Sequence, residues 1–263
     1  MHTDRSKAFA DIRLLGEERL ADPKLDLTNE PGIVALVDAV DGTDLLERNL
    51  GNWCCASLFF QPSRPAGSRI LAAIVGLPNR TAYHATVSSP DAHVIRKLDG
   101  NSERVYGTSG MESLAAASLY FYGQKLKNLR DSIQILTPLL DQSRPDLRIY
   151  TLAGIPMLVR LVDHAVPHAR GIDVVFDLLG QRPHDAIPGL FIAKKGGAAI
   201  IDLNGHDITF EEMEEALLRP ASGRIKYVAA STMKLALEFL NALKPPTVSR
   251  SKTRPIQSGL FGG

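Results

Sequence analysis

Two aspartates and a glycine turn follow a short apolar run near the start of the chain. Asp38 and Asp41 come directly after residues 33–37, whose apolar, partly β-branched side chains are typical of a buried strand. A strand end that leads into a glycine turn clusters carboxylate oxygens, which suits a hard divalent cation. Gly42 and Thr43 then open a short predicted helix, whose free N–H groups favour an anion. We therefore expect a metal ion and a phosphate group to meet within a few residues of each other.

Two further acidic segments lie far away along the chain. Glu17 and Glu18 form an acidic pair near the N-terminus, and Asp185 opens an apolar helical pattern that ends at Gly196. Clustered carboxylates repel one another unless cations neutralise them. Without a cysteine and histidine ligand set, oxygen ligands favour Mg²⁺ or Mn²⁺ over Zn²⁺. Each acid taken singly is equally consistent with a helix cap or an exposed charge.

The three segments, GEE, DAVDGT and HDAIPGLFIAKKGGAAIIDLNG, occur in the order and approximate spacing of the inositol monophosphatase family. The chain resembles an N-terminally short member of that superfamily from about Leu14 to about Leu243. The family consists of magnesium-dependent, lithium-sensitive phosphomonoesterases, and it includes fructose bisphosphatases and bisphosphate nucleotidases. The resemblance implies an α+β or α/β fold, the layered α-β-α-β-α sandwich of the sugar phosphatases with mixed and antiparallel sheets.

The resemblance also implies a role for each matching residue. Two or three Mg²⁺ ions, with Mn²⁺ as an alternative, would be held by carboxylates and one backbone carbonyl. The amides of Gly42 and Thr43 would receive the phosphate, and the Thr43 hydroxyl would help to orient the attacking water. The implied catalytic residues are Thr43, Asp41 and Glu17, and the implied metal ligands are Glu17, Asp38, the carbonyl of Val40, Asp41 and Asp185.

The chain also departs from the family pattern. Asp44 and two leucines follow Thr43, His184 replaces a tryptophan before the last metal aspartate, and only a short segment precedes Glu17. Asp177 is the nearest match to an acidic residue that binds substrate hydroxyls in relatives, but its spacing from Asp185 is one residue too long. The polar end of a buried strand is an equally good interpretation of Asp177.

The implied function is that of a Mg²⁺-dependent phosphoric monoester hydrolase, inositol monophosphatase-like, that acts on a small phosphorylated polyol, sugar or nucleotide with metal-activated water as the nucleophile. A fructose-1,6-bisphosphatase and a 3′-phosphoadenosine-5′-phosphate phosphatase are the alternatives among enzymes. A catalytically weak regulatory protein that keeps the fold is the alternative from another class. The altered DGTDLL segment favours this regulator, whereas the complete set of metal carboxylates favours the enzyme.

Composition excludes several other functions. The 263 residues carry a net charge of about +1 with both signs interspersed, which argues against nucleic-acid or membrane-surface partners. No apolar run approaches the length of a membrane span. Cys54 and Cys55 are adjacent in a strand-like segment, so they point to opposite faces and favour a reducing, cytoplasmic compartment. The expected partner is a small phosphorylated metabolite, and the family resemblance implies a homodimer.

The elements that must position these acids are predicted from local patterns. Apolar segments at residues 53–60, 70–77 and 82–87 predict a mostly antiparallel sheet. Ser109 and Glu112 form a capping-box pattern that predicts a helix to about residue 127. Further along, strands and helices alternate. The predicted strands are 148–152, 172–176, 198–203 and 226–230, and the predicted helices are 156–165, one from Asp185, one capped by Thr209 with Glu212, and one ending near 243.

These patterns predict two halves and a tail. Residues 1–144 form an α+β half with the GEE and DAVDGT motifs, and residues 145–243 form an α/β half with Asp185. The metal site is expected in the cleft between the two halves. Residues 244–263, rich in proline, serine, arginine and glycine, are predicted to be disordered.

Overall fold

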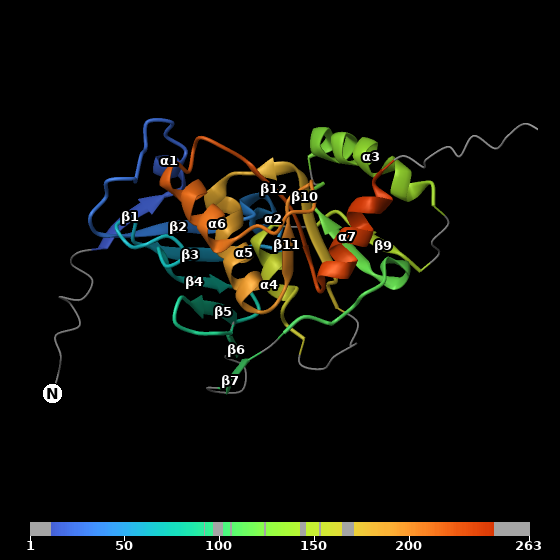
Figure 1. Cartoon of the computed structure of the whole chain (residues 1–263), viewed down its shortest axis with the longest axis horizontal. Helices are drawn as coiled ribbons and strands as arrows, with labels where there is room; N and C mark the ends of the chain where they lie inside the picture. Colours follow the sequence, from blue (N-terminus) through green and yellow to red (C-terminus); the bar gives the residue numbers. More distant parts are fainter. Residues whose placement is uncertain are drawn as a thin grey trace, which may run out of the picture.

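The computed structural model describes residues 12–91, 93–96, 102–105, 107–123, 125–142, 146–152, 154–164 and 171–244, and of 93–96 and 102–105 only the backbone. In this part, the chain forms two β-sheets with helices between them and on one outer side (Figure 1). The predicted tail after residue 244 lies outside the described residues. No described helix is both long and apolar enough to cross a membrane.

The first sheet has seven strands in the order of the sequence. Only β1 and β2 are parallel, and every other neighbouring pair is antiparallel, which confirms the predicted mostly antiparallel sheet. Two short helices follow its first two strands. The strands are β1 (Ile12–Gly16), β2 (Ile33–Asp41), β3 (Cys54–Phe60), β4 (Ile70–Gly76), β5 (Thr81–Thr86), β6 (His93–Arg96) and β7 (Ser102–Val105), and the helices are α1 (Glu17–Leu20) and α2 (Thr43–Glu47).

The second sheet is mixed and has the order β11-β12-β10-β8-β9. β8 runs parallel to both β9 and β10, whereas β12 runs antiparallel to both β10 and β11. Four of these five strands correspond to strands predicted from the sequence. The strands are β8 (Ser118–Phe121), β9 (Arg148–Tyr150), β10 (Val174–Gln181), β11 (Ala199–Ile201) and β12 (Ile225–Ala230).

The helices form two layers. α5 (Pro183–Lys195) lies between the sheets and contacts both, with α4 (Ile155–Arg160) and α6 (Phe210–Leu218) packed beside it. Its side chains are buried on nearly every face, as expected for a helix enclosed between sheets. α3 (Leu126–Leu140) and α7 (Met233–Ala242) cover the other face of the second sheet.

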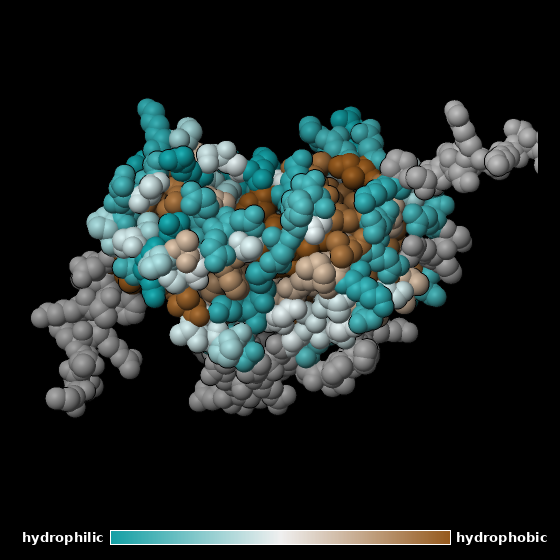
Figure 2. Space-filling view, in the orientation of Figure 1, coloured by the Kyte–Doolittle hydropathy of each residue, from teal (hydrophilic) through white to brown (hydrophobic). Residues whose placement is uncertain are grey.

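Two hydrophobic cores hold these layers together. One fills the space between the sheets, and the other lies under α3 and α7, where the Phe176 ring packs 5.6 Å from Phe121 and 4.6 Å from Phe239. Burying each such ring stabilises the fold by about 1.5–3 kcal/mol. Figure 2 shows polar residues over most of one face, with apolar surface visible between α3 and α7.

Four of the five expected layers are present among the described residues. On the outer face of the first sheet, Leu14 is 72% exposed and Ile74 is 45% exposed. No described helix covers these two side chains, so the first helical layer of the expected sandwich is not seen in this part of the chain.

One predicted helix is wrong. Residues 109–113 form neither a helix nor a strand, a 3₁₀ turn follows at η3 (Leu114–Ala116), and β8 lies within the rest of the predicted helix. The Ser109 hydroxyl donates to Asp173 at 2.8 Å instead of capping a helix. The helix α3, which the sequence did not predict, follows β8. Both elements precede residue 144 but pack with the second sheet, while the division into domains stays a prediction.

Candidate active site

The end of β2 aims two carboxylates toward one side of the sheet. The register between β2 and β3 shifts between Asp38 and Asp41, and such a bulge turns side chains that regular alternation would send to opposite faces. The Asp38 carboxylate accepts the Val40 N–H at 3.0 Å, which closes the turn. Gly42 has φ +92°, and a β-carbon there would lie 3.2 Å from the carbonyl oxygen of Asn52. The turn therefore requires glycine.

The other two predicted acids come from separate elements. In the parallel pairing of β1 with β2, Gly16 lies opposite Val37, which brings Glu17 alongside Asp38. Asp185 is the third residue of α5, in its first turn, where the helix dipole favours a negative charge. Glu18 does not line the pocket that these acids share.

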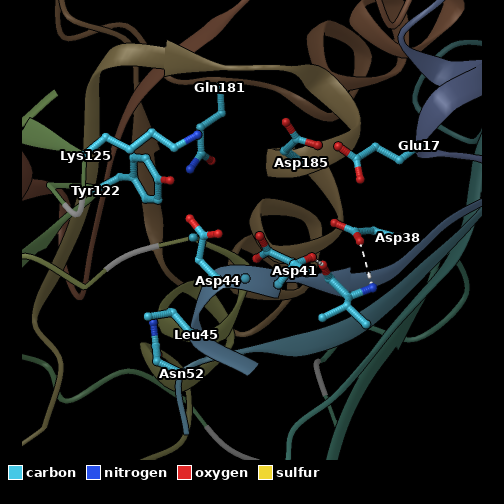
Figure 3. A pocket seen from close by; sticks show the side chains of 14 residues that line it. Glu17, Asp38, Asp41, Asp44, Leu45, Asn52, Tyr122, Lys125, Gln181 and Asp185 are labelled. Carbon is cyan, nitrogen blue, oxygen red and sulfur yellow. Dashed lines mark hydrogen bonds between the residues drawn. The ribbon is translucent and has the colours of Figure 1, made fainter. Parts of the chain in front are cut away.

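The structure brings all four predicted carboxylates to one pocket of about 340 Å³ (Figure 3). Glu17, Asp38 and Asp185 approach it from one side, and Asp41 lies at its centre. The pocket is lined by Glu17, Asp38, Val40, Asp41, Gly42, Thr43, Asp44, Leu45, Asn52, Tyr122, Lys125, Gly154, Gln181 and Asp185.

Burial and mutual repulsion make these acids hard to ionise. Burial, followed by the charges of Glu17 and Asp185, raises the pKa of Asp38 to about 6. Burial, followed by the charges of Asp38 and Asp185, raises the pKa of Asp41 to about 7. For Asp185, burial and then Glu17 raise the pKa to about 6. Perturbed carboxyl groups that share a pocket are typical of functional sites.

Positive charge does not relieve this repulsion directly. Among the described residues, no lysine or arginine forms an ion pair with Glu17, Asp38 or Asp41. His184 Nε2 lies 3.1 Å from Asp185 Oδ1, but neither ring nitrogen of His184 forms a hydrogen bond within the described structure. Burial lowers the pKa of His184 to about 4, so its ring is neutral at pH 7. Their charge is thus relieved either by protons, which the raised pKa values favour, or by a cation from outside the chain.

The donor chemistry fits Mg²⁺ or Mn²⁺, because all the candidate ligands are hard oxygens. In the described part of the chain, however, no three acidic, histidine or cysteine side chains stand close enough together to hold one ion. Ligation of a single ion would therefore require the side chains to move closer together. The ligand set stays a prediction.

The turn predicted to bind phosphate leads into a short helix. Gly42 precedes α2, and its carbonyl accepts the N–H groups of Leu45 and Leu46 at 2.9 and 3.0 Å. The Thr43 hydroxyl donates to the Val40 carbonyl at 3.2 Å, so these two groups lie next to each other in the turn. The oxygen of Thr43 keeps acceptor capacity for a further hydrogen bond.

Asp177 is not brought into the pocket. Its carboxylate accepts the N–H groups of Leu179 and Gly180 at 2.9 and 2.6 Å, and it is only 7% exposed. These bonds stabilise the irregular end of β10, where the register with β12 shifts. Gln181, four residues further on, lines the pocket instead.

Sequence reasoning missed the other wall of the pocket. Tyr122 and Lys125 lie between β8 and α3, in a segment for which a helix was predicted, and Gly154 precedes α4. Gly154 has φ +93°, and a β-carbon there would lie 3.2 Å from Asp41 Oδ2. The adjacent Ile155 N–H donates to the same oxygen at 3.3 Å. Of these residues, only Gly154 lies near a local signal, because Pro156, two residues further on, is typical of the first turn of a helix.

The fold and the pocket together define an α+β protein of two packed sheets with a carboxylate-rich pocket at their junction. No family model matches the sequence, and no curated protein matches it. Solved structures do match, among them a hypothetical protein from Pyrococcus horikoshii with similarities to inositol-1 monophosphatase. That match has 19% identity and a TM-score of 0.59, and it covers 91% of this chain and 80% of the other.

Two other solved structures match over the same share of this chain. SuhB of Mycobacterium tuberculosis has 16% identity and a TM-score of 0.61, with 91% of this chain and 80% of the other covered. A gene product described as inositol monophosphatase-fructose 1,6-bisphosphatase has 16% identity and a TM-score of 0.58, with 91% and 79% covered. The chain has the fold of the inositol monophosphatases, as its motifs predicted.

Proposed function

We propose that this protein is a Mg²⁺-dependent phosphomonoesterase that hydrolyses a small phosphorylated polyol or sugar. One observation carries the proposal: Glu17, Asp38, Asp41 and Asp185 reach one pocket from separate elements of an inositol monophosphatase fold. A pure scaffold gains nothing from four clustered acids, because their repulsion costs stability.

Glu17, Asp38, Asp41, Asp185 and the Val40 carbonyl would hold two or three divalent ions. Bound divalent ions supply Lewis-acid chemistry, which neutralises phosphate oxygens and makes water a better nucleophile at neutral pH. The ligands are all hard oxygens, so Mg²⁺ is preferred and Mn²⁺ is the alternative.

The turn after β2 would bind the phosphate group. The N–H groups of Gly42 and Thr43 lie at the positive end of α2, where an anion is favoured. Because the Thr43 hydroxyl donates to the Val40 carbonyl, its oxygen is left to accept a hydrogen bond from the attacking water. Thr43 would thus orient the nucleophile.

Three other functions have support of their own. The name of one structural neighbour joins inositol monophosphatase with fructose 1,6-bisphosphatase activity, and another neighbour was solved with bound 2′-AMP, which supports a sugar bisphosphatase or a nucleotide phosphatase. A catalytically weak regulatory protein is supported by the spread of the acidic side chains, which do not yet gather around one ion.

Phosphate release from a substrate panel tests the proposal. The panel contains inositol-1-phosphate, fructose-1,6-bisphosphate, 3′-phosphoadenosine-5′-phosphate and β-glycerophosphate, each measured with Mg²⁺ and with EDTA. We expect Mg²⁺-dependent turnover that Asp185→Asn abolishes and that Asp141→Asn, an exposed aspartate at the end of α3, leaves unchanged. Mg²⁺ binding without turnover on any substrate would favour the regulatory protein.

A cytoplasmic location and a homodimer complete the proposal. Cys54 and Cys55 are both free, which supports a reducing compartment. Light scattering of the purified chain tests the dimer, and a monomeric mass would exclude it.

A further inference from the structure

A second cavity lies on the inner face of the second sheet, beside its edge strand β9. Its volume of about 480 Å³ exceeds that of the candidate active site, and the two cavities share no lining residue in the described part of the chain. Tyr120 of β8 lines this cavity and also packs against the core between the sheets, whereas Tyr122 lines the candidate active site. The polar and aromatic side chains of the second cavity are Ser118, Tyr120, Asp146, Arg148, Tyr150 and Asp173.

Two tyrosines give this cavity a flat aromatic surface. Tyr120 lies opposite Tyr150 in the parallel pairing of β8 with β9, and the two rings stack with centroids 4.6 Å apart and planes 15° apart. Among the described residues no strand lies beyond β9, and Tyr150 is 37% exposed. A planar ring can therefore continue the stack on Tyr150.

Arg148 supplies a positive charge next to the rings. It points to the same face of β9 as Tyr150, because alternate residues of a strand share a face. No described carboxylate forms an ion pair with its guanidinium group. The planar guanidinium group matches the geometry of a phosphate, so Arg148 is free to bind one.

Two carboxylates add hydrogen-bond acceptors. Asp173 is only 4% exposed, and its Oδ1 accepts the Ser109 hydroxyl at 2.8 Å, which leaves that oxygen capacity for a further bond. Asp146 is exposed and lines the same cavity. A ligand for this cavity should thus carry hydroxyl or amino donors besides an anionic group and a planar ring.

We propose that the second cavity binds a nucleoside monophosphate at a site separate from the candidate active site. The base stacks on Tyr150, and the phosphate pairs with Arg148. Asp146 and Asp173 accept hydrogen bonds from the ribose hydroxyls or from an amino group of the base. The cavity has a suitable size, since sites for small molecules range from about 300 to 1,000 Å³.

Calorimetry with three matched ligands tests this site. The protein in EDTA is titrated with AMP, with adenosine, which lacks the phosphate, and with ribose-5-phosphate, which lacks the base. EDTA keeps divalent ions out of the acidic pocket, whose carboxylates then repel a phosphate. We expect AMP to bind more tightly than either partial ligand by about tenfold or more, the factor for one charge-assisted hydrogen bond. No binding of AMP, or equal binding of AMP and ribose-5-phosphate, would overturn the proposal.

Arg148→Met tests the phosphate contact. We expect it to weaken AMP binding by about tenfold and to leave adenosine binding unchanged. Arg130→Met is the matched control, because Arg130 is exposed on α3 and contacts Asp131 at 3.3 Å, away from the cavity. AMP binding that is the same in Arg148→Met and in the unmodified protein would contradict the assignment.

Tyr150→Leu and Tyr150→Phe separate stacking from folding. The leucine variant should bind AMP more weakly, whereas the phenylalanine variant keeps the ring and should keep both Tm and affinity. Equal losses of affinity in the two variants would show that the hydroxyl group, and not the ring, binds the ligand, which would overturn the stacking.

Asp185→Asn distinguishes the two cavities. Removal of one negative charge from the candidate active site would strengthen AMP binding there, but it should leave binding in the second cavity unchanged. Stronger AMP binding in Asp185→Asn without a loss in Arg148→Met would place AMP in the acidic pocket and would refute the second site. None of these measurements depends on turnover, so the site stands or falls independently of the proposed phosphatase.

Discussion

At the scale of single residues, Asp41 lies where two distant segments meet. Its Oδ2 accepts the Ile155 N–H, and the Cys54 Sγ lies 3.9 Å from the same oxygen. Gly154 passes so close that a β-carbon would lie 3.2 Å from this carboxylate. The position of Asp41 therefore depends on a residue more than a hundred positions away in the chain.

Gly154→Ala tests this close approach. The substitution combines a left-handed backbone, at φ +93°, with contact against Asp41, and the backbone term alone costs about 1–2 kcal/mol. We expect a lower Tm and a weaker effect of Mg²⁺ on Tm. Gly223→Ala is the control, since Gly223 has no positive φ and open space around its α-carbon. Equal behaviour of the two variants would show that Gly154 does not constrain the site.

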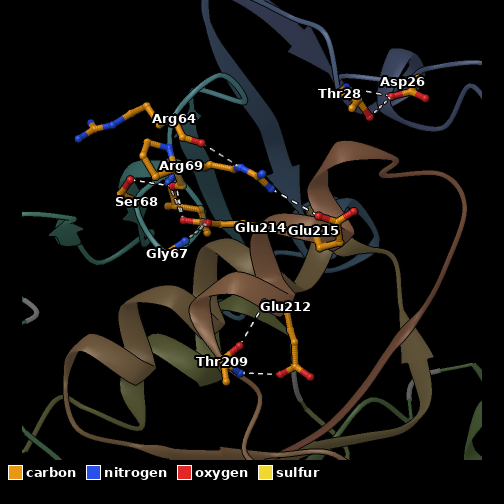
Figure 4. Close-up of polar contacts among 12 residues, drawn as sticks. Asp26, Thr28, Arg64, Gly67, Ser68, Arg69, Thr209, Glu212, Glu214 and Glu215 are labelled. Carbon is orange, nitrogen blue, oxygen red and sulfur yellow. Dashed lines mark hydrogen bonds and ion pairs between the residues drawn. The ribbon is translucent and has the colours of Figure 1, made fainter.

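At the scale of elements, α6 joins the two sheets through one buried carboxylate (Figure 4). Glu214 is 1% exposed and accepts the N–H groups of Gly67, Arg69 and Ile70 at 2.6, 2.7 and 3.1 Å. These residues lead from β3 into β4, two inner strands, so α6 is fixed to the connection between them at one end of the first sheet. The neighbouring Glu215 is exposed and makes only a 3.4 Å contact with Arg69.

Glu214→Gln and Glu215→Gln form a matched pair. The Glu214 carboxylate accepts the three N–H groups on its two oxygens, whereas a glutamine side chain has only one oxygen. We therefore expect Glu214→Gln to lower the free energy of unfolding by about 2 kcal/mol. The exposed change at position 215 should cost less than about 0.5 kcal/mol. Urea unfolding of both variants measures the difference. Similar losses would mean that α6 is held mainly by its apolar face.

Of two capping-box patterns with the same spacing, only one begins a helix. Thr209 and Glu212 form a real capping box at the start of α6, as predicted. Ser109 and Glu112 have the same spacing, yet no helix begins there, because Ser109 bonds to Asp173. Leu119 and Phe121 then alternate into the core of the second sheet. Pairing with a strand distant in sequence overrode the local helix signal.

At the scale of the whole molecule, the acidic pocket makes stability depend on pH. The pKa of Asp41, raised to about 7 by burial and by its acidic neighbours, means that the folded protein binds its proton more tightly than the unfolded chain. Stability of the metal-free protein must therefore fall as pH rises through 7. The lowered pKa of His184 acts in the opposite direction, but only below about pH 6.5.

The window from pH 6.5 to 8 isolates this effect. For the protein in EDTA, we expect a loss of about 1 kcal/mol across the window, which Asp41→Asn should abolish. Mg²⁺ at about one hundred times its Kd should restore about 2.7 kcal/mol. Thermal unfolding at several pH values measures both effects. Unchanged stability in EDTA across this window would show that Asp41 is already ionised at pH 6.5.

The four carboxylates of the pocket could be found from the sequence because each lies within a local signal. Asp38 and Asp41 leave a short apolar strand into a glycine turn, and Asp185 opens an apolar helix. Strand and turn chemistry act over a few residues, so they can be recognised without knowledge of the fold. Most strands and helices after residue 147 were predicted for the same reason, but the order of the strands in the second sheet was not.

The opposite wall of the pocket was decided by tertiary structure alone. Tyr122 and Lys125 follow β8, and Gln181 is the last residue of β10. Asn52 precedes β3 of the first sheet. None of these side chains has a local pattern that points to a ligand, because their meeting depends on how two sheets pack across α5. By itself, the sequence singled out the four acids that share the pocket. Only the packing of the two sheets decided which side chains lie opposite these acids in the pocket. Contacts between segments far apart in the chain produce no hydrophobic periodicity that could be recognised in the sequence.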